Sequence, residues 1–462
     1  MGSLGASLSA NTFPGTKTLP SFWRSQPHLL DTHRSTPEIP QSCDVIIIGA
    51  GYAGVSTAYH LLCNEELTSQ SPPLSVVMLE AREACSGATA RNGGHLRPSI
   101  FGRLPGYLEK YGSDFVLDLI DFECGHISDI SLAVEKEKID CDFTPTTSLN
   151  VYVDQDAAAA AKSAFLHLKE IAGSRAAIRN TRWIEGDEAE KVSSVKGAVG
   201  CFQFPAIHLW PYKLVMALLQ RVVESGLNLQ THTPVQHVVS SQTDAGKWTV
   251  HTTRGAITAA KVIFATNGYT AGLLPEYKTK IVPSKGICCR IKFSPKTLHI
   301  PLQNSYCIWL RNGSCDYLIP RHDNSIIVGG ARSEFFHEKH NWYNRTDDNS
   351  LIYPARNYFN EYMQTNFCGW EKSDAHVDSI WTGIMGYNSD SLPNIGAVPN
   401  RPGCFIEAGF QGNGMPIIWP VSRGIAEMVL KGKSYEELGL PLLYQTSKER
   451  LQSPTDHMLG RL

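Results

Sequence analysis

The sequence predicts an α/β fold in which a discontinuous Rossmann-type dinucleotide-binding domain carries an inserted antiparallel-sheet substrate domain. A strand, a glycine-rich turn, a helix and a second strand follow one another between about 44 and 80 and make one βαβ unit. A sequence pattern similar to that of this unit recurs near 230–270. A buried strand over 404–408 again precedes glycines and a helix from about 422 to 430. Short alternating segments between about 280 and 335 are instead typical of an antiparallel sheet with one solvated face.

The first βαβ unit is the most informative element. Residues 44–48 (Asp-Val-Ile-Ile-Ile) and 75–80 are apolar runs typical of strands buried on both faces, and residues 55–62 have helical spacing. The motif Gly49-Ala-Gly51-Tyr-Ala-Gly54 lies between the first strand and the helix. A lone glycine motif of this kind is often only a turn, but this context favours a dinucleotide site.

Each residue of the motif has a physical role in such a site. Gly49 allows the tight turn, Gly51 lets the backbone approach a pyrophosphate, and Gly54 lets the helix pack closely on the strand. Free N–H groups at the start of the helix face the phosphates. Glu80 ends the next strand, where an acid accepts hydrogen bonds from ribose hydroxyls.

A second glycine-rich loop distinguishes between two dinucleotides. It covers residues 86–95 (Ser-Gly-Ala-Thr-Ala-Arg-Asn-Gly-Gly-His), directly after the ribose acid. A plain NAD domain has no use for such a loop, whereas a chain running back along the diphosphate towards a flavin ring does. We therefore expect FAD rather than NAD.

Composition sets further limits. The chain has 462 residues, of which 42 % are hydrophobic and 19 % charged, as in a globular protein of two domains. Its 42 Lys and Arg balance 44 Asp and Glu, which argues against nucleic acid as a partner. Twelve cysteines without a CxxC pair favour reduced thiols over a disulfide framework.

The two ends of the chain suggest a location. Prolines between Pro14 and Pro40 interrupt any helix, so residues 1–42 are expected to form an extended arm. No apolar run is long enough for a signal peptide or a membrane span, which favours a cytoplasmic protein. The C-terminal Gly460-Arg461-Leu462 is similar to a peroxisomal signal, but Gly460 departs from it, and a peroxisomal location is the weaker alternative.

Four segments in this order resemble the D-amino-acid-oxidase-like (DAO) family of FAD-dependent oxidoreductases. Within that family they are most similar to γ-glutamylputrescine oxidases and to fungal FAD-dependent oxidoreductases. Two of the segments are the βαβ unit and the loop 86–95. The third is Trp210-Pro-Tyr-Lys with a helix, Gly226, Thr233-Pro-Val235 and the run 262–268. The fourth joins residues 381–396 (Trp-Thr-Gly-Ile-Met-Gly-Tyr-Asn-Ser-Asp-Ser-Leu-Pro-Asn-Ile-Gly) to 408–415.

The resemblance implies where FAD is held. Arg82 and Val235 would lie on the adenine side, and the loop 86–95 near the isoalloxazine. Residues 409–415 would present backbone N–H groups to the pyrimidine edge of the ring. The implied cofactor contacts are Gly49, Gly51, Ala53, Gly54, Glu80, Ala81, Arg82, Gly87, Ala88, Thr89, Arg91, Asn92, Gly93, Gly94, His95, Val235, Ala265, Thr266, Asn267, Gly268, Gly383, Asp390, Gly409, Phe410, Gly412, Asn413, Gly414 and Met415. No metal site is expected.

Two departures from the family pattern matter. Some relatives attach flavin covalently through Cys or His, but the matching positions here are Gly383 and Arg91, so we expect non-covalent FAD. In sarcosine oxidase a Lys that helps O2 react lies on the strand matched by residues 325–330. This chain has Ile326 and Ile327 there, which leaves the electron acceptor open.

The implied activity is that of an FAD-dependent oxidase acting on an amine or amino acid. A hydride would leave a carbon next to nitrogen, giving an imine and, with O2 as acceptor, hydrogen peroxide. The alternatives are a dehydrogenase that passes electrons to a quinone or protein, and a binding protein that holds flavin without turnover. The candidate substrate residues are His95, Arg97, Trp381 and Asn413.

Each of these candidates has a plainer interpretation. His95 could simply close its loop, and Arg97 could be a solvated arginine instead of a clamp for a carboxylate. Trp381, offered as an aromatic wall, is more often plain core, and Asn413 could contact the cofactor instead. The expected domains are FAD-binding over 43–100, 205–278 and 380–440, substrate-binding over 101–204 and 279–379, and a tail over 441–462.

Overall fold

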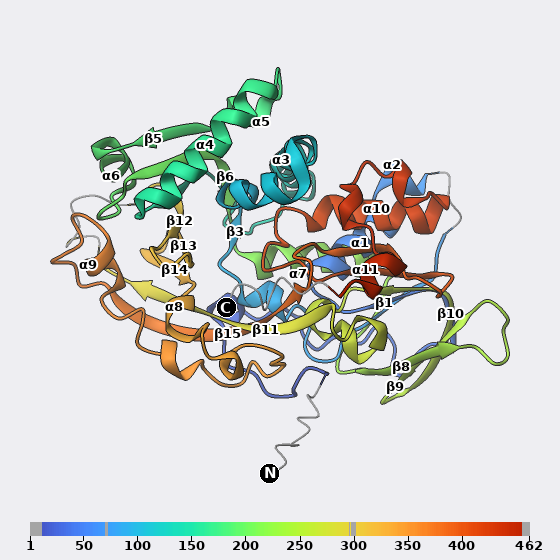
Figure 1. Cartoon of the computed structure of the whole chain (residues 1–462). Coiled ribbons are helices and arrows are strands. Elements are labelled where there is room, and N and C mark those ends of the chain that lie inside the picture. Colours follow the sequence, from blue (N-terminus) through green and yellow to red (C-terminus); the bar gives the residue numbers. More distant parts are fainter. Residues whose placement is uncertain (1–11, 70–72, 295, 297–301, 455–462) are drawn as a thin grey trace, which may run out of the picture.

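The computed structural model describes residues 12–69, 73–294, 296 and 302–454, and these form two sheets that lie side by side (Figure 1). The first sheet has the strand order β16-β17-β10-β1-β2-β7, and β8 and β9 extend it from β10. Its strands are β1 Ser42–Ile48, β2 Val76–Leu79, β7 Asn228–Gln230, β8 Val235–Ser240, β9 Trp248–Thr252, β10 Gly255–Phe264, β16 Asn394–Ala397 and β17 Cys404–Ala408. The strands β7, β2, β1, β10 and β17 run parallel, as the α/β prediction requires.

The centre of this sheet is buried on both faces. Val45 and Ile47 of β1 pack against helices α1, α7 and α10, whereas Ile46 and Ile48 pack on the opposite face against residues of β8–β10. The strand needs apolar side chains on both sides for this reason, which explains its unbroken Val-Ile-Ile-Ile run. The three helices are α1 Tyr52–Leu62, α7 Pro211–Glu224 and α10 Ile418–Lys431.

The second sheet has the order β15-β11-β14-β13-β12-β4-β6-β3, with β5 paired to β6. Every pair in it is antiparallel except β12 with β4. Its strands are β3 His95–Leu96, β4 Thr144–Tyr152, β5 Arg182–Glu185, β6 Gly200–His208, β11 Ile281–Lys292, β12 Ser305–Trp309, β13 Cys315–Pro320, β14 Ser325–Gly329 and β15 His376–Asn388. The predicted antiparallel segments therefore belong to one larger sheet.

The other α-helices of the described residues surround the two sheets. They are α2 Glu65–Thr68, α3 Leu104–Glu137, α4 Gln155–Ile171, α5 Ala176–Arg179, α6 Asp187–Ser193, α8 Arg332–Phe335, α9 Tyr362–Asn366 and α11 Lys448–Gln452. Only α3 is long, and it bends at Gly112, whose φ is +77°. No helix of the described residues is long and apolar enough to cross a membrane.

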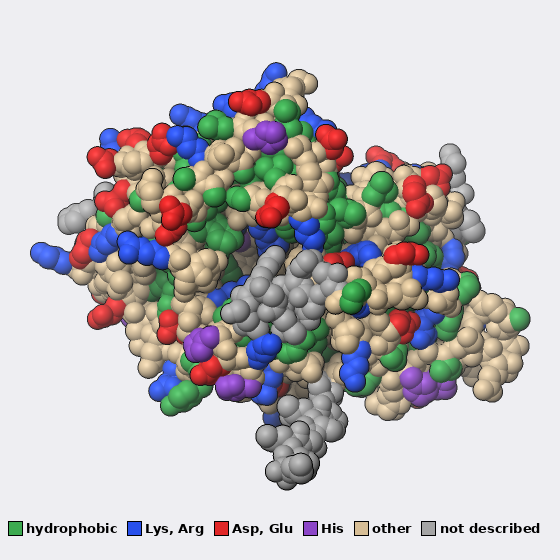
Figure 2. Space-filling model, in the orientation of Figure 1, with side chains coloured by type: hydrophobic (Ala, Val, Ile, Leu, Met, Phe, Trp, Pro, Cys, Tyr) green, Lys and Arg blue, Asp and Glu red, His purple; other side chains and the backbone are tan. Residues whose placement is uncertain are grey.

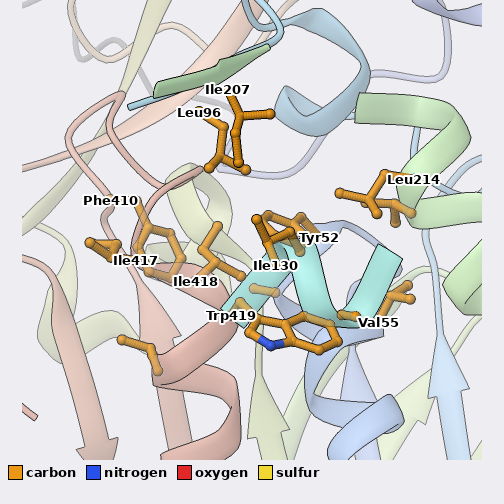
Figure 3. Close-up of a cluster of buried hydrophobic side chains, with 14 of the residues drawn as sticks. Tyr52, Val55, Leu96, Ile130, Ile207, Leu214, Phe410, Ile417, Ile418 and Trp419 are labelled. Carbon is orange, nitrogen blue, oxygen red and sulfur yellow. The ribbon is translucent and has the colours of Figure 1, made fainter. Parts of the chain in front are cut away.

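The two sheets share one core. Figure 3 shows Leu96 and Ile207, from β3 and β6 of the second sheet, above Tyr52 of α1 and Ile418 of α10. All four side chains belong to the same buried cluster, together with Ile130 of α3. The long strands β11 and β15 also contact the turn that follows β10. These contacts fix the position of the two sheets relative to each other. The candidate site lies in the space between the sheets.

Several details differ from the sequence predictions. Residues 376–388 form a single strand of the second sheet and residues 200–208 another, so the boundaries predicted at 380 and 205 cut through strands. The arm contains a 3₁₀ turn, Phe22–Arg24, with Trp23 fully buried. Residues 442–454 of the predicted tail pack against the rest of the protein, where Thr446 N donates to Ile395 O of β16 at 2.8 Å.

The cysteine prediction is wrong for one pair. Cys307 of β12 and Cys315 of β13 form a disulfide that closes their hairpin, although their spacing matches no recognised motif. The other cysteines are free. The C-terminal tripeptide lies outside the described residues.

Candidate active site

A cavity of about 1100 Å³ lies between the two sheets. At one end it is lined by the glycine turn before α1 and by Glu80 at the end of β2, and at the other by side chains of the second sheet. Carboxyl ends of parallel strands are where open α/β sheets bind ligands. The predicted positions that line it are Gly49, Gly51, Ala53, Glu80, Ala81, Arg82, Gly87, Ala88, Thr89, Arg91, Asn92, Gly93, His95, Arg97, Val235, Ala265, Thr266, Asn267, Gly383, Phe410, Gly412, Asn413, Gly414 and Met415.

The glycine turn has the geometry that its predicted roles require. Gly49 has a φ of +110°, and a Cβ there would lie 2.7 Å from Ala265 O. A Cβ on Gly54 would lie 2.0 Å from Gly49 O, so only glycine lets α1 approach β1 this closely. At Gly51 the nearest atom to an added Cβ is Thr89 Oγ1, at 3.2 Å, and the remaining space belongs to the cavity.

The residues around this turn fit a dinucleotide. Gly51 is the N-cap of α1 and has no side chain to cap the helix. Tyr52 N donates to Thr89 Oγ1 at 2.9 Å, so the N–H groups that follow it in the first turn are the ones that could face a phosphate. Glu80 is held in place because its carboxylate accepts hydrogen bonds from Ala50 N and Arg82 N, both at 2.9 Å. An open glycine cradle, a helix start without a side-chain cap from Gly51 and a fixed acid together match the diphosphate and ribose of FAD.

Two arginines that line the cavity form ion pairs with an aspartate that the sequence analysis did not include among the site residues. Asp348 pairs with Arg82 at 2.9 Å and with Arg91 at 3.3 Å, and the side chains of all three are almost fully buried. Arg91 also donates to Ser86 O and Thr382 O, at 2.9 Å each. Arg82 was expected on the adenine side, but its guanidinium is occupied by Asp348, so it acts mainly by holding the loop in place.

The two positions where relatives attach flavin are neighbours in space. A Cβ on Gly383 of β15 would lie 2.9 Å from Arg91 Cβ, although the residues are far apart in the chain. Neither offers a thiol or an imidazole. The geometry is consistent with FAD held by non-covalent contacts alone.

The loop 86–95 is linked to the turn 409–415. Asn92 donates to Thr89 O at 3.0 Å and contacts Met415 Sδ at 3.5 Å. Asn267 Oδ1 accepts hydrogen bonds from Gly409 N at 3.1 Å and from Phe410 N at 3.3 Å. Segments from the start, middle and end of the chain thus meet along one wall of the cavity.

The far end of the cavity contains His95 and Arg97. His95 Nε2 lies 2.7 Å from Ser305 Oγ, and its Nδ1 is buried without a hydrogen-bond partner among the described residues. Burial, followed by the nearby charges of Arg97 and His208, holds the pKa of His95 well below its usual range, so the ring is neutral at pH 7. Arg97 donates to Asn150 Oδ1, and burial lowers its pKa to about 10, which leaves it protonated.

Six predicted residues do not line the cavity. Gly54, Gly94, Gly268 and Gly409 act behind its wall, where a Cβ would clash with neighbouring atoms. Trp381 is fully buried and donates to Arg91 O at 3.0 Å, so the expected aromatic wall is wrong and the tryptophan supports the loop from behind. Asp390 pairs with Arg450 at 2.8 Å and does not reach the cavity, which corrects its assignment as a cofactor contact.

Other lining residues were missed by the sequence analysis. Phe13 and Pro14 of the arm line the cavity, as do Arg103, Lys285 and Arg332. Lys285 is paired with Asp347 at 3.0 Å, so its charge is compensated. No local pattern marks these residues, because each enters the site from a different segment.

The charges of the cavity are strongly unbalanced. Among the described lining residues Glu80 is the sole carboxylate, and it lies at the nucleotide end. The lining cations are Arg82, Arg91, Arg97, Arg103, Lys110, Lys285 and Arg332. Figure 2 shows charges of both signs scattered over one face of the molecule, whereas the described lining of the cavity is mainly positive.

Known proteins resemble this chain over most of its length. Gamma-glutamylputrescine oxidoreductase of Escherichia coli (strain K12) is 23 % identical over 396 residues, which cover 84 % of each chain. Glycine oxidase of Bacillus licheniformis is 22 % identical over 395 residues, covering 84 % of this chain and 93 % of that protein. The crystal structure of glycine oxidase from Geobacillus kaustophilus superposes with a TM-score of 0.70 at 18 % identity, over 88 % of this chain and 99 % of that one.

The family assignment rests on the match to a family model. Residues 44–428, which include the glycine turn, the loop 86–95 and the turn 409–415, match the model of the DAO family, described as FAD dependent oxidoreductase. The same residues build the cradle described above, and the fold agrees with that of the solved glycine oxidase. The chain therefore belongs to the DAO family of FAD-dependent oxidoreductases, with FAD as its cofactor.

Proposed function

We propose that the protein oxidises an amino acid or a related amine that carries a carboxylate. The substrate would lose a hydride from the carbon next to nitrogen and a proton from nitrogen, giving an imine. With O2 as the acceptor, the two electrons and two protons appear as hydrogen peroxide. FAD supplies the electron-accepting chemistry, and the residues of this chain bind and orient the substrate.

The observation that carries this proposal is the charge of the substrate end. Arg97 is protonated, lines the cavity and has no ion-pair partner among the described residues, and it donates a hydrogen bond to Asn150 Oδ1. A planar guanidinium in such a place suits a carboxylate, which it binds through two parallel N–H donors. A substrate carboxylate would give this charge a partner inside the cavity, which Glu123, lying outside it, does not supply by direct contact.

The groups beside Arg97 favour an amine donor. His95 is neutral at pH 7 and lines the same end, so it would add no positive charge to repel an approaching ammonium. The two curated relatives are named for a glutamylated amine and for glycine, and this agrees with a substrate that has both nitrogen and carboxylate.

A second candidate is a dehydrogenase that transfers its electrons to a quinone or a protein. It is favoured by Ile326 and Ile327, which are fully buried in β14, where an oxygen-activating Lys was expected by resemblance. Both functions share the first half of the reaction. They differ in the acceptor that reoxidises the protein.

One experiment separates these possibilities. The purified holoprotein is mixed without oxygen with a panel of amino acids and simple amines, and the flavin absorbance is followed. We expect carboxylate-bearing amines to bleach the flavin and the matched decarboxylated amines to fail. Admitting O2 then tests for peroxide. Bleaching without peroxide supports the dehydrogenase, and no bleaching by any member of the panel contradicts the proposed amine chemistry.

A further inference from the structure

The substrate end of the cavity contains more positive charge than one carboxylate requires. Arg103 lies directly before α3, and Arg332 is the first residue of α8. Both line the same cavity as Arg97. Tyr387 of β15 connects them, because the Arg332 guanidinium carbon lies 5.6 Å from its ring centroid and Arg103 interacts electrostatically with its hydroxyl group.

These two arginines are not neutralised by ion pairs. Within the described part of the chain, no carboxylate lies within 4.0 Å of the guanidinium nitrogens of Arg103 or Arg332. Arg103 donates a side-chain hydrogen bond to Tyr107 Oη, at 3.3 Å. The arginines at the nucleotide end differ in this respect, since Asp348 pairs with both of them.

One buried acid lies near Arg103 without entering the cavity. Glu123 interacts electrostatically with Arg97 and Arg103, but its carboxylate is held by Ser99 N at 2.6 Å and Ile100 N at 2.9 Å. It does not line the cavity, although burial raises its pKa and its carboxylate raises the pKa values of Arg97 and Arg103 from behind the wall.

Uncompensated cations in a partly desolvated space repel one another. Burial lowers the pKa of Arg97, Glu123 partly offsets this, and the charge of Arg103 lowers it again, so the positive charge of Arg103 acts against that of Arg97. An anion placed between them would relieve this repulsion and gain charge-assisted hydrogen bonds. One carboxylate on Arg97 leaves Arg103 and Arg332 without a counter-charge.

We propose that the substrate carries two carboxylates, one bound by Arg97 and the second, remote from the reacting carbon, bound by Arg103 and Arg332. Amino or imino dicarboxylates form this chemical class. The inference rests on the proposed function for the identity of the reacting amine. The anion subsite itself can be tested without any turnover.

The test titrates the oxidised holoprotein with malonate, succinate and glutarate at constant ionic strength, and follows the flavin absorbance. Acetate, propionate and butyrate are the monoanionic controls. We expect at least one dicarboxylate to bind ten times more tightly than the monocarboxylate of similar length. Equal affinities for the two series would overturn the proposal.

Variants assign the preference to residues. Arg332→Gln should bring the dicarboxylate affinity down about tenfold, close to that of the monocarboxylate, and leave the monocarboxylate affinity unchanged. Arg356→Gln is the matched control, because Arg356 is exposed and stacks on Tyr353 outside the cavity. A preference that survives both Arg332→Gln and Arg103→Gln, in variants that retain their FAD, would overturn the assignment.

The same samples separate this inference from the proposed function. If dicarboxylates bind preferentially but no amine bleaches the flavin, the anion subsite stands and the amine chemistry is wrong. If simple monocarboxylic amino acids bleach the flavin as efficiently as amino dicarboxylates, the amine chemistry stands and the second subsite is wrong.

Discussion

At the scale of single residues, the space around each glycine decides what the turn before α1 tolerates. At Gly54 a Cβ would lie 2.0 Å from a backbone oxygen, so any side chain there disrupts the packing of α1 on β1. At Gly51 the protein itself leaves room, with Thr89 Oγ1 at 3.2 Å as the nearest atom. A side chain at Gly51 would therefore interfere with the bound ligand and not with the packing of α1 on β1.

We predict that Gly51→Val abolishes FAD binding. The branched side chain would occupy the cavity where the diphosphate approaches the helix start. Since a bound cofactor stabilises the native state by mass action, the variant should also unfold at a lower temperature. The measurement is the flavin-to-protein absorbance ratio after purification. Gly125→Val is the control, because Gly125 is exposed on α3 with no atom near its added Cβ, and normal flavin content in Gly51→Val would contradict the site.

Glu407 predicts a pH dependence of stability. It is fully buried on β17, accepts hydrogen bonds from Thr57 Oγ1 at 2.6 Å and Ser422 Oγ at 2.8 Å, and burial raises its pKa to about 7. A pKa raised in the folded state means that stability is present at low pH and is lost as pH rises towards 7. The rise of this pKa from 4.5 to about 7 corresponds to about 3 kcal/mol in the free energy of unfolding.

The test compares the wild type with Glu407→Gln in urea unfolding between pH 5 and pH 8. The uncharged amide does not ionise, so the variant should gain about 3 kcal/mol relative to the wild type across this range. A constant difference at all pH values would show that Glu407 is ionised throughout. Using the difference between the two proteins removes the contribution of every other titrating group.

At the scale of elements, the sequence predicted those helices and strands whose bounds depend on neighbouring residues in the chain. The start of α7 at Pro211 and the bounds of β17 agree with the sequence, because a proline at the first helical position and a continuous apolar run are local signals. Helix α3 was missed, since Gly106, Gly112 and Gly125 weaken its helical pattern and tertiary packing supplies the stability. The domain boundaries inside β6 and β15 were missed because strand pairing is not local.

The N-terminal arm is an element whose role the sequence did not reveal. Trp23 is fully buried and donates through Nε1 to Asn92 O at 2.6 Å, which ties the arm to the loop 86–95. Ser21 donates to Ala90 O at 2.5 Å, and Arg91 donates to Leu19 O at 2.9 Å. The arm therefore supports the back of the cofactor loop.

We predict that Trp23→Ala lowers the free energy of unfolding by about 3–5 kcal/mol, the usual cost of emptying a buried aromatic site. It should also weaken FAD binding, because the loop at Asn92 loses its support. Trp370→Ala is the matched control, since Trp370 is equally buried but belongs to the separate core of the second sheet. We expect similar destabilisation in both variants and a raised dissociation constant for FAD only in Trp23→Ala. Unchanged FAD affinity in Trp23→Ala would rule out the supporting role.

At the scale of the whole molecule, the site exists only where the two sheets meet. The glycine cradle was predictable because its residues are neighbours in the sequence and serve one helix start. The cation pair Arg103 and Arg332 was not, because the two residues come from distant segments and each alone looks like a surface arginine. The sequence therefore predicted most of the residues that line the cavity near the glycine turn, and at the other end it predicted His95 and Arg97.

The last prediction concerns the acceptor. Electron transfer to O2 builds negative charge beside the flavin, and a fixed cation nearby stabilises that charge. The buried Ile326 and Ile327 supply none. His95, one of the two candidates from the sequence, is neutral at pH 7, so of these two Arg97, protonated and lining the cavity, is the substitute to test; Arg103 and Arg332 also line the cavity.

We therefore expect stopped-flow reoxidation of the reduced protein by O2 to slow at least tenfold in Arg97→Gln and to remain unchanged in His95→Ala. Lys285→Met is the decisive comparison. Lys285 is the other buried cation whose position in the cavity could serve, but its pairing with Asp347 compensates its charge. Rapid reoxidation in Arg97→Gln with slow reoxidation in Lys285→Met would assign the oxygen reaction to β11 and refute the role of Arg97. Slow reoxidation by O2 in the wild type, with fast reoxidation by a soluble quinone, would instead identify the protein as a dehydrogenase.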